Sequence, residues 1–131
     1  MALPGGRRES GDPDLLSTAI RETSEEVGFV LLPEDLVGTL NDVVPRTPVL
    51  PPIAVRPFVF LPAYRPQLIL NPEVADARWV QLDRLFHSES RRPVAVEIQG
   101  GSREVEAYHL EDAVVWGMTE RILTSLSVLL T

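Results

Sequence analysis

Three glutamates near the start of the chain have the type and spacing to hold a metal ion. Glu22, Glu25 and Glu26 fall within roughly 100° of arc when the stretch is read as a helix of about 100° per residue. Glu22 and Glu26 are like charges at i,i+4, which destabilises a helix by about 0.2–0.5 kcal/mol. A divalent cation such as Mg²⁺ takes clustered carboxylate oxygens and would reverse the sign of that interaction. The alternative is an acidic face that is only solvated.

The element that must position these carboxylates is predicted to be a helix. The run Asp12 to Asp14 is typical of a helix start, and Gly28 is typical of a helix end. Before the helix, Gly5 and Gly6 lack side chains, so their backbone can approach a metal or a phosphate closely. The residues expected to pack this helix on the body of the protein share one arc of roughly 140°. They are Leu15, Leu16, Ala19, Ile20, Thr23 and Val27.

The order of these residues resembles the Nudix box, the signature of hydrolases that cleave a nucleoside diphosphate linked to another group. The run 21–28 (RETSEEVG) has the spacing of the second half of that signature, with Thr23 where the family has a hydrophobic residue. In the first half, five residues lead from Gly6 to Asp12, where the family has Glu, and eight rather than seven separate Asp12 from the Arg-Glu pair. This departure, with Pro4 before the glycine pair, is similar to the coenzyme A diphosphatase branch.

The resemblance implies an enzyme that uses Mg²⁺ or Mn²⁺. In the family, the Glu of the Arg-Glu pair and the two following Glu bind the metal, which here implies Glu22, Glu25 and Glu26. Glu22 and Glu26 are the foremost candidates, and the backbone carbonyl of Gly6 is a further candidate ligand. The general base of Nudix proteins often lies outside the box, which implies Glu73 in a turn before a late strand, with Glu25 as the competing base.

The residues beside the glycine pair are the candidates for contact with the substrate. They are Gly5, Gly6, Arg7 and Arg8. For Arg7 and Arg8 the alternative is plain exposure at the surface. Arg21 is counted with the catalytic candidates, and we expect it to hold a nearby carboxylate (a neighbour of Glu22, Glu9 or Asp12) by bidentate hydrogen bonds rather than to touch the substrate. Trp79 and Trp116 are read as packing residues.

Composition limits what the protein can do. A chain of 131 residues is long enough for one hydrophobic core, and 44% hydrophobic with 24% charged residues is typical of a globular domain. A net charge of -7 argues against nucleic acid as a partner, and the absence of Cys excludes disulfides and a thiolate nucleophile. There is no apolar leader, and Glu120 and Arg121 interrupt the last apolar run, so we expect a cytoplasmic protein that makes no use of a membrane.

The pattern of elements predicts an α/β (α+β) fold, with a Nudix-like mixed β-sheet sandwiched between helices. The first helix is followed by strands, a proline-rich loop at 45–52, a short helix, a hairpin around Gly100-Gly101 and a closing helix. The expected strands are 36–44, 53–61, 64–70, 77–82, 94–98 and 104–110, and the expected later helices are 83–87 and 112–130.

The box begins within six residues of Met1, whereas strands of the central sheet precede it in Nudix proteins. We therefore expect residues 1–131 to be a single Nudix domain that is incomplete at its N-terminus and lacks its first strands. A sheet in that state has an uncovered edge, at which a second copy of the chain could pair to form a homodimer.

The resemblance implies hydrolysis of a diphosphate bond in a small nucleotide derivative. The leading substrate is coenzyme A or an acyl derivative, cut to 3′,5′-ADP and a 4′-phosphopantetheine. The alternatives are a Nudix hydrolase for ADP-ribose, dinucleotides or nucleoside triphosphates, and a non-catalytic or incomplete Nudix domain.

Overall fold

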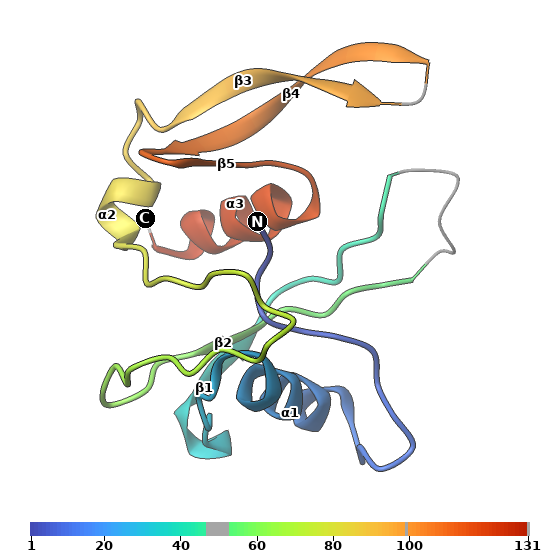
Figure 1. The fold of residues 1–131 in the computed structure, drawn as a ribbon, viewed down its shortest axis with the longest axis vertical. Helices are drawn as coiled ribbons and strands as arrows, with labels where there is room; N and C mark the ends of the chain where they lie inside the picture. Colours follow the sequence, from blue (N-terminus) through green and yellow to red (C-terminus); the bar gives the residue numbers. More distant parts are fainter. Residues whose placement is uncertain (47–52, 99, 131) are drawn as a thin grey trace. The chain divides into compact units, whose positions relative to one another are not determined.

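The computed structural model describes residues 1–46, 53–98 and 100–130, which belong to two compact units (Figure 1). The helix unit comprises Leu3–Asn41 and Arg56–Trp79, and the hairpin unit comprises Met1–Ala2, Asp42–Val55 and Val80–Thr131. The acidic residues of the first helix all belong to the helix unit. That residues 1–131 act as one Nudix domain stays a prediction.

The first helix, α1, spans Leu15–Val27 and begins and ends where the sequence predicts. The side chain of the N-cap residue Asp14 accepts a hydrogen bond from the Ser17 amide at 2.8 Å, which satisfies one free donor of the first turn. At the other end, Gly28 adopts a left-handed conformation with φ 72° and donates its N–H to the Ser24 carbonyl at 3.0 Å. Both ends are therefore set by local chemistry.

Replacing Gly28 by Ala is expected to destabilise the helix unit by about 1–3 kcal/mol, because a Cβ disfavours positive φ and would lie 2.9 Å from the Ile69 Cβ. Urea unfolding followed by Trp79 fluorescence in a Trp116→Phe background would measure the loss within this unit. Gly11→Ala is the matched control, since nothing lies within 4 Å of the Cβ it would add. Equal stability of the two alanine variants would contradict this explanation of Gly28.

After a short 3₁₀ turn at Pro33–Asp35, two short strands of the helix unit pair antiparallel. They are β1 (Leu36–Thr39) and β2 (Phe58–Phe60), both shorter than the predicted strands 36–44 and 53–61. The register shifts between Leu36 and Gly38, and Pro57 before β2 has no N–H to donate. In the hairpin unit, Val43 and Val55 form an isolated bridge. Most of the predicted proline-rich loop, residues 47–52, lies outside the described residues.

The two strands predicted at 64–70 and 77–82 are wrong. Neither stretch joins a ladder with any strand in the described ranges, and Leu82 already belongs to a helix. The connecting segment is attached to the end of α1 instead: the Ile69 amide donates to Val27 O and the Asn71 amide donates to Glu26 O, both at 2.9 Å. Alternating apolar residues produce a strand only where a partner strand is in reach, and here single backbone hydrogen bonds replace the ladder.

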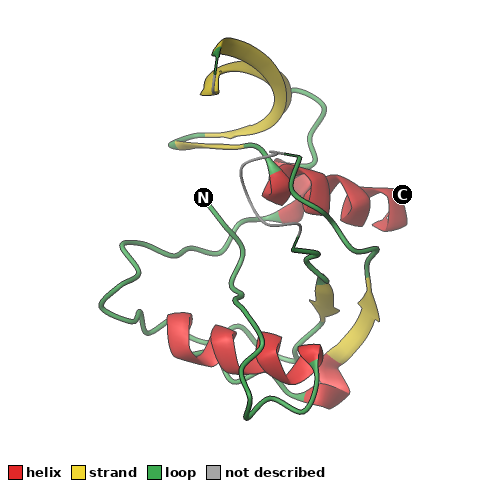
Figure 2. Ribbon diagram, turned by 90° about the vertical axis from the view of Figure 1, so that its right-hand side faces the viewer, coloured by secondary structure: helices red, strands yellow, loops and turns green. Residues whose placement is uncertain are grey.

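The hairpin unit contains the predicted hairpin, with a longer first strand than expected. β3 (Arg91–Ile98) pairs antiparallel with β4 (Gly101–Leu110), and β4 pairs with β5 (Ala113–Val115). Gly100 and Gly101 have φ of 91° and 137°, which explains why the turn uses glycine. Seen in Figure 2, the hairpin is strongly twisted, as long two-stranded ribbons are.

Two helices complete the hairpin unit. α2 spans Leu82–Leu85, close to the predicted 83–87, and α3 spans Met118–Leu130. The predicted closing helix 112–130 begins too early, because residues Ala113–Val115 form β5 and Gly117 has φ 74°. The core of the unit consists of Leu85, Tyr108 and Val115 with their apolar neighbours.

The described elements confirm the α/β fold class: helices accompany two small antiparallel sheets, β1-β2 and β3-β4-β5, rather than one mixed sheet. Among the described residues, no helix is long and apolar enough to cross a bilayer. Pairing of two copies through an open sheet edge stays a prediction.

Candidate functional site

A buried aspartate ties the loop before α1 to the helix. The Asp12 carboxylate accepts hydrogen bonds from the Glu9 amide and the Thr18 hydroxyl, both at 2.9 Å. It also accepts two from the Arg21 guanidinium, Nε to Oδ1 and Nη2 to Oδ2, both at 3.0 Å. The bonds from Arg21 and then the bond from the Glu9 amide hold the pKa of Asp12 well below its usual range. Asp12 therefore remains ionised and anchors Arg21.

Arg21 uses its remaining donors on the carboxylates of its own helix. Its Nη1 lies 3.1 Å from Glu22 Oε1 and 3.1 Å from Glu25 Oε2. Its Nη2 also donates to the Arg7 carbonyl at 3.3 Å. The paired bonds to Asp12 are the main reason that the pKa of Arg21 is raised. This is the carboxylate-holding geometry that the sequence predicts for Arg21.

Glu22 and Glu26 converge on the glycine pair. The Gly5 amide donates to Glu26 Oε1 at 3.1 Å. At Gly6, an added Cβ would lie 2.5 Å from the Glu22 carboxyl carbon, so a larger residue there would displace the Glu22 carboxylate from the loop. Burial, opposed by the Gly5 amide and assisted by the neighbouring carboxylates of Glu22 and Glu25, raises the pKa of Glu26. The fold therefore holds the carboxylates of Glu22 and Glu26 near each other although they repel, which is unfavourable for stability.

This donor set fits a hard divalent cation. Two carboxylates and a glycine loop supply oxygen ligands of the kind that Mg²⁺ and Mn²⁺ prefer, and a positive charge between Glu22 and Glu26 would relieve their repulsion. Among the described residues, however, no group of three acidic or histidine side chains is already arranged to hold a metal. Glu25, which is half exposed, is paired with Arg21 instead of turning toward Glu22 and Glu26.

The two arginines after the glycine pair differ. Arg8 donates from Nε to Asp12 O at 3.1 Å and from Nη2 to Pro13 O at 2.9 Å, so its guanidinium fastens the loop to the start of the helix. The Arg7 side chain is exposed, and within the described part of the chain its guanidinium has no hydrogen-bond partner. Of the two, only Arg7 is open to an incoming phosphate.

Arg7→Ala is expected to lower kcat/KM for a diphosphate substrate about tenfold and to leave stability unchanged, since it removes a charge-assisted contact with a phosphate and none within the fold. Arg8→Ala is the matched substitution next to it, and it should cost about 1–2 kcal/mol of stability through its two lost hydrogen bonds. Steady-state kinetics and urea unfolding of both variants separate the two roles. Identical kinetics for Arg7→Ala and wild type would contradict the assignment.

The predicted base Glu73 lies on the segment that joins the end of α1. Its amide donates to the Asn71 side-chain oxygen at 2.9 Å, which closes a small turn, and the Asn71 amide in turn donates to Glu26 O. The Glu73 side chain is exposed. The structure therefore brings the Glu73 backbone to the same end of α1 as Glu26, whereas the competing base Glu25 is paired with Arg21.

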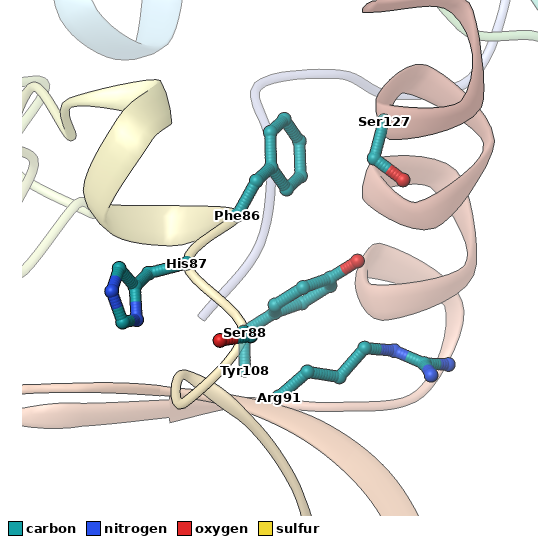
Figure 3. Close-up of a pocket in the computed structure, with 6 residues that line it drawn as sticks. All are labelled: Phe86, His87, Ser88, Arg91, Tyr108 and Ser127. Atoms are coloured by element: carbon teal, nitrogen blue, oxygen red, sulfur yellow. The ribbon is translucent and has the colours of Figure 1, made fainter. Parts of the chain in front are cut away.

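A hollow of about 340 Å³ in the hairpin unit has polar walls but few open groups (Figure 3). The Tyr108 hydroxyl lies 2.7 Å from Thr124 Oγ1. Arg91 lies 3.6 Å from Glu120 and 3.9 Å from Glu106, so two carboxylates balance its charge. Figure 3 shows the His87 ring turned away from α3. Tyr108 and Arg91, two of the polar side chains that line this hollow, therefore already have partners outside its lining.

Comparison with known proteins agrees with this geometry. The model of the NUDIX domain matches residues 1–98, which include α1 and the whole acidic face. The chain therefore belongs to the Nudix family.

Curated relatives extend the likeness over nearly the whole chain. Proteins named uncharacterized Nudix hydrolase NudL, from Salmonella paratyphi B and Salmonella newport, are 30% identical over 129 residues, which cover 98% of this chain and 65% of theirs. An uncharacterized protein of Schizosaccharomyces pombe is 36% identical over 102 residues, which cover 74% of this chain and 31% of that protein. The chain thus spans from about a third to just under two thirds of the length of these relatives.

Sequence reasoning missed two parts of this arrangement. Thr18 is buried, and its hydroxyl donates a hydrogen bond to the Asp12 carboxylate. In the sequence, the only signal of this role is a hydroxyl residue six positions after an acidic one. The Gly5 amide donates a hydrogen bond to the Glu26 carboxylate. From the sequence, Gly5 is expected only to let the backbone approach a metal or a phosphate closely. Trp79 and Trp116, expected to be packed, are each 45% exposed.

Proposed function

We propose that this protein hydrolyses a diphosphate bond in a nucleotide derivative, using Mg²⁺ or Mn²⁺ held at the acidic face of α1. The observation that carries the proposal is the convergence of Glu22 and Glu26 on the Gly5-Gly6 loop. Two neighbouring carboxylates repel each other and destabilise the fold when no cation is bound. A divalent cation bound between them would remove that repulsion.

Glu22 and Glu26 are the residues that would hold the metal, and the Gly6 carbonyl is an additional ligand candidate. When bound, the cation would offset the charge of the diphosphate oxygens and lower the pKa of a bound water. Arg21, anchored by Asp12, acts as a positioning residue that fixes Glu22 and Glu25 along the face. The Gly6 amide and the Arg7 guanidinium bind and orient the phosphates, while the Gly5 amide holds the Glu26 carboxylate.

For the general base we propose Glu73 rather than Glu25. A base must be able to reach the attacking water, and the exposed Glu73 carboxylate is on a turn that adjoins the end of α1. Glu25 is paired with the guanidinium of Arg21, which favours a role in positioning. Comparing kcat of Glu73→Gln and Glu25→Gln across pH assigns the base, since only removal of the base abolishes the acidic limb of the profile.

The substrate that we propose is coenzyme A or an acyl-coenzyme A, on the strength of the similarity of the Pro4-to-Gly28 stretch to coenzyme A diphosphatases. The products would be 3′,5′-ADP and a 4′-phosphopantetheine. Chromatography of products formed from coenzyme A, ADP-ribose and diadenosine diphosphate, each with Mn²⁺, tests this proposal. Release of 3′,5′-ADP is the expected result. Robust cleavage of ADP-ribose with no cleavage of coenzyme A would instead favour the second candidate, a Nudix hydrolase for ADP-ribose or dinucleotides.

A non-catalytic role is the remaining candidate, favoured by the incomplete convergence of the acidic residues in the described structure. It predicts Mn²⁺ binding without turnover of any of the three substrates.

A further inference from the structure

The turn that carries Glu73 is joined to the end of α1 through Asn71. The Asn71 amide donates to Glu26 O at 2.9 Å. The Asn71 carbonyl accepts the Val74 amide at 2.8 Å, and the Asn71 side-chain oxygen accepts the Glu73 amide at 2.9 Å. One residue therefore bonds the helix on one side and two amides of the turn on the other.

The segment before the turn can lie against α1 because the helix ends in glycine. The Ile69 amide donates to Val27 O at 2.9 Å, beside the bond from Asn71 to Glu26 O. A Cβ on Gly28 would lie 2.9 Å from the Ile69 Cβ and 3.0 Å from the Ile69 carbonyl oxygen. The two amides thus reach carbonyls of the last turn of α1, which have no partner within the helix.

The turn buries little, so hydrogen bonds must set its position. The side chains around Asn71, which is itself half-buried, are exposed: Ile69, Leu70, Pro72 and Glu73. Pro72 has a fixed φ and no N–H, so the first amide that the Asn71 side chain can accept after it is that of Glu73. Such a turn fixes the direction in which residue 73 follows the end of α1.

From these contacts we propose that Asn71 is a positioning residue for the proposed reaction. Its side-chain oxygen holds the Glu73 amide and thereby keeps residue 73 at the end of α1 that carries Glu26, without touching the substrate. This inference rests on the proposed function, in which Glu73 is the general base and Glu26 helps to hold the cation. A base displaced by about 1 Å can slow a reaction about a hundredfold, so its support matters.

Asn71→Ala tests the role cleanly, because it removes the side-chain acceptor and leaves both backbone bonds of residue 71 possible. We expect kcat for a diphosphate substrate with Mn²⁺ to fall about 10–100-fold, with KM and Mn²⁺ affinity unchanged. Asn71→Ser should recover part of the loss, since a hydroxyl oxygen accepts the same amide more weakly. Asn41→Ala, at an exposed Asn of the same unit, is the matched control and should keep wild-type kcat.

Amide hydrogen exchange, followed by NMR in EDTA, tests the contact without metal or turnover. In Asn71→Ala the Glu73 amide should exchange about tenfold faster than in wild type, because it loses its acceptor. The Val74 amide bonds to a backbone carbonyl and should keep its wild-type rate. An unchanged exchange rate of the Glu73 amide would overturn the proposal.

A double-mutant cycle shows whether Asn71 acts through Glu73. In a Glu73→Gln background, Asn71→Ala should cause no further fall in kcat, since the base whose position it sets is absent. An equal fall in both backgrounds, or an unchanged kcat in Asn71→Ala alone, would overturn this inference and leave the metal site standing. A wild-type chain that turns over no diphosphate would overturn the proposed function, and the positioning role with it.

Discussion

Glu26→Gln is expected to lose turnover of its diphosphate substrate by about a thousandfold or more, because it removes one of the two carboxylates proposed to hold the cation. The same variant should unfold at a temperature about 2–4 °C above wild type in EDTA. Gln retains an Oε1 that accepts from the Gly5 amide, and its neutral side chain ends the repulsion with Glu22. Steady-state kinetics with Mn²⁺ and thermal unfolding in EDTA measure the two effects.

The opposite signs of these effects make the prediction specific. An ordinary destabilising substitution lowers both activity and stability, whereas a residue kept for its ligand can raise stability when neutralised. Glu34→Gln, the same change at an exposed site of the helix unit, should alter neither property. A Glu26→Gln variant that is both inactive and less stable than wild type would point to a structural role for Glu26.

Asp12→Asn is expected to lower the melting temperature by roughly 10 °C, because it leaves the Arg21 guanidinium without its main counter-charge in a mostly buried place. Turnover should fall as well, since Arg21 then no longer holds Glu22 and Glu25 in a fixed orientation. Thermal unfolding with Trp79 fluorescence and kcat measured on the same samples test both expectations.

The contribution of Asp12 has a definite pH dependence. Its pKa is lowered in the folded chain, so the folded state binds fewer protons than the unfolded state, and the stabilisation is complete above the ordinary Asp pKa of about 3.9. It is lost as the pH falls below that value toward the lowered pKa. The stability gap between wild type and Asp12→Asn should therefore be constant near neutral pH and narrow in acid.

Asp14→Asn is the control for Asp12→Asn, because Asn caps a helix about as well as Asp and the substitution removes a charge two residues away. It should change the melting temperature little. A loss as large in Asp14→Asn as in Asp12→Asn would show that charge at the helix start, rather than the Asp12–Arg21 pair, is what matters.

The elements that could be predicted from the sequence are those whose determinants are local. The limits of α1 follow from Asp14 and Gly28, and the hairpin follows from Gly100-Gly101, each within a few residues of the structure it sets. The stretches 64–70 and 77–82 have strand-like residues, but the pairing that makes a strand depends on a distant partner that no local pattern reveals. The prediction of a helix over residues 113–115 (Ala-Val-Val) failed for the same reason, because these residues pair with β4 as a strand.

In the candidate site, too, the contacts within one helix could be predicted from the sequence and the contacts with a separate loop could not. Spacing along one helix predicts that Glu22, Glu25 and Glu26 share a face and that Arg21 pairs with a carboxylate. What spacing cannot give is how a helix face meets a separate loop: the Gly5 amide on Glu26 and the open guanidinium of Arg7 depend on the path of residues 5–12. Nor could local spacing predict that Trp79 is 45% exposed, since its strand-like stretch joins no ladder among the described residues.

The central claim is that Glu22 and Glu26 together bind one divalent cation, and an electron paramagnetic resonance titration of Mn²⁺ tests it most directly. Wild type and Glu34→Gln should each bind one Mn²⁺ that is competed by Mg²⁺, while Glu26→Gln should bind it about 10–100-fold more weakly. The same Mn²⁺ affinity in folded Glu26→Gln as in wild type would contradict the claim.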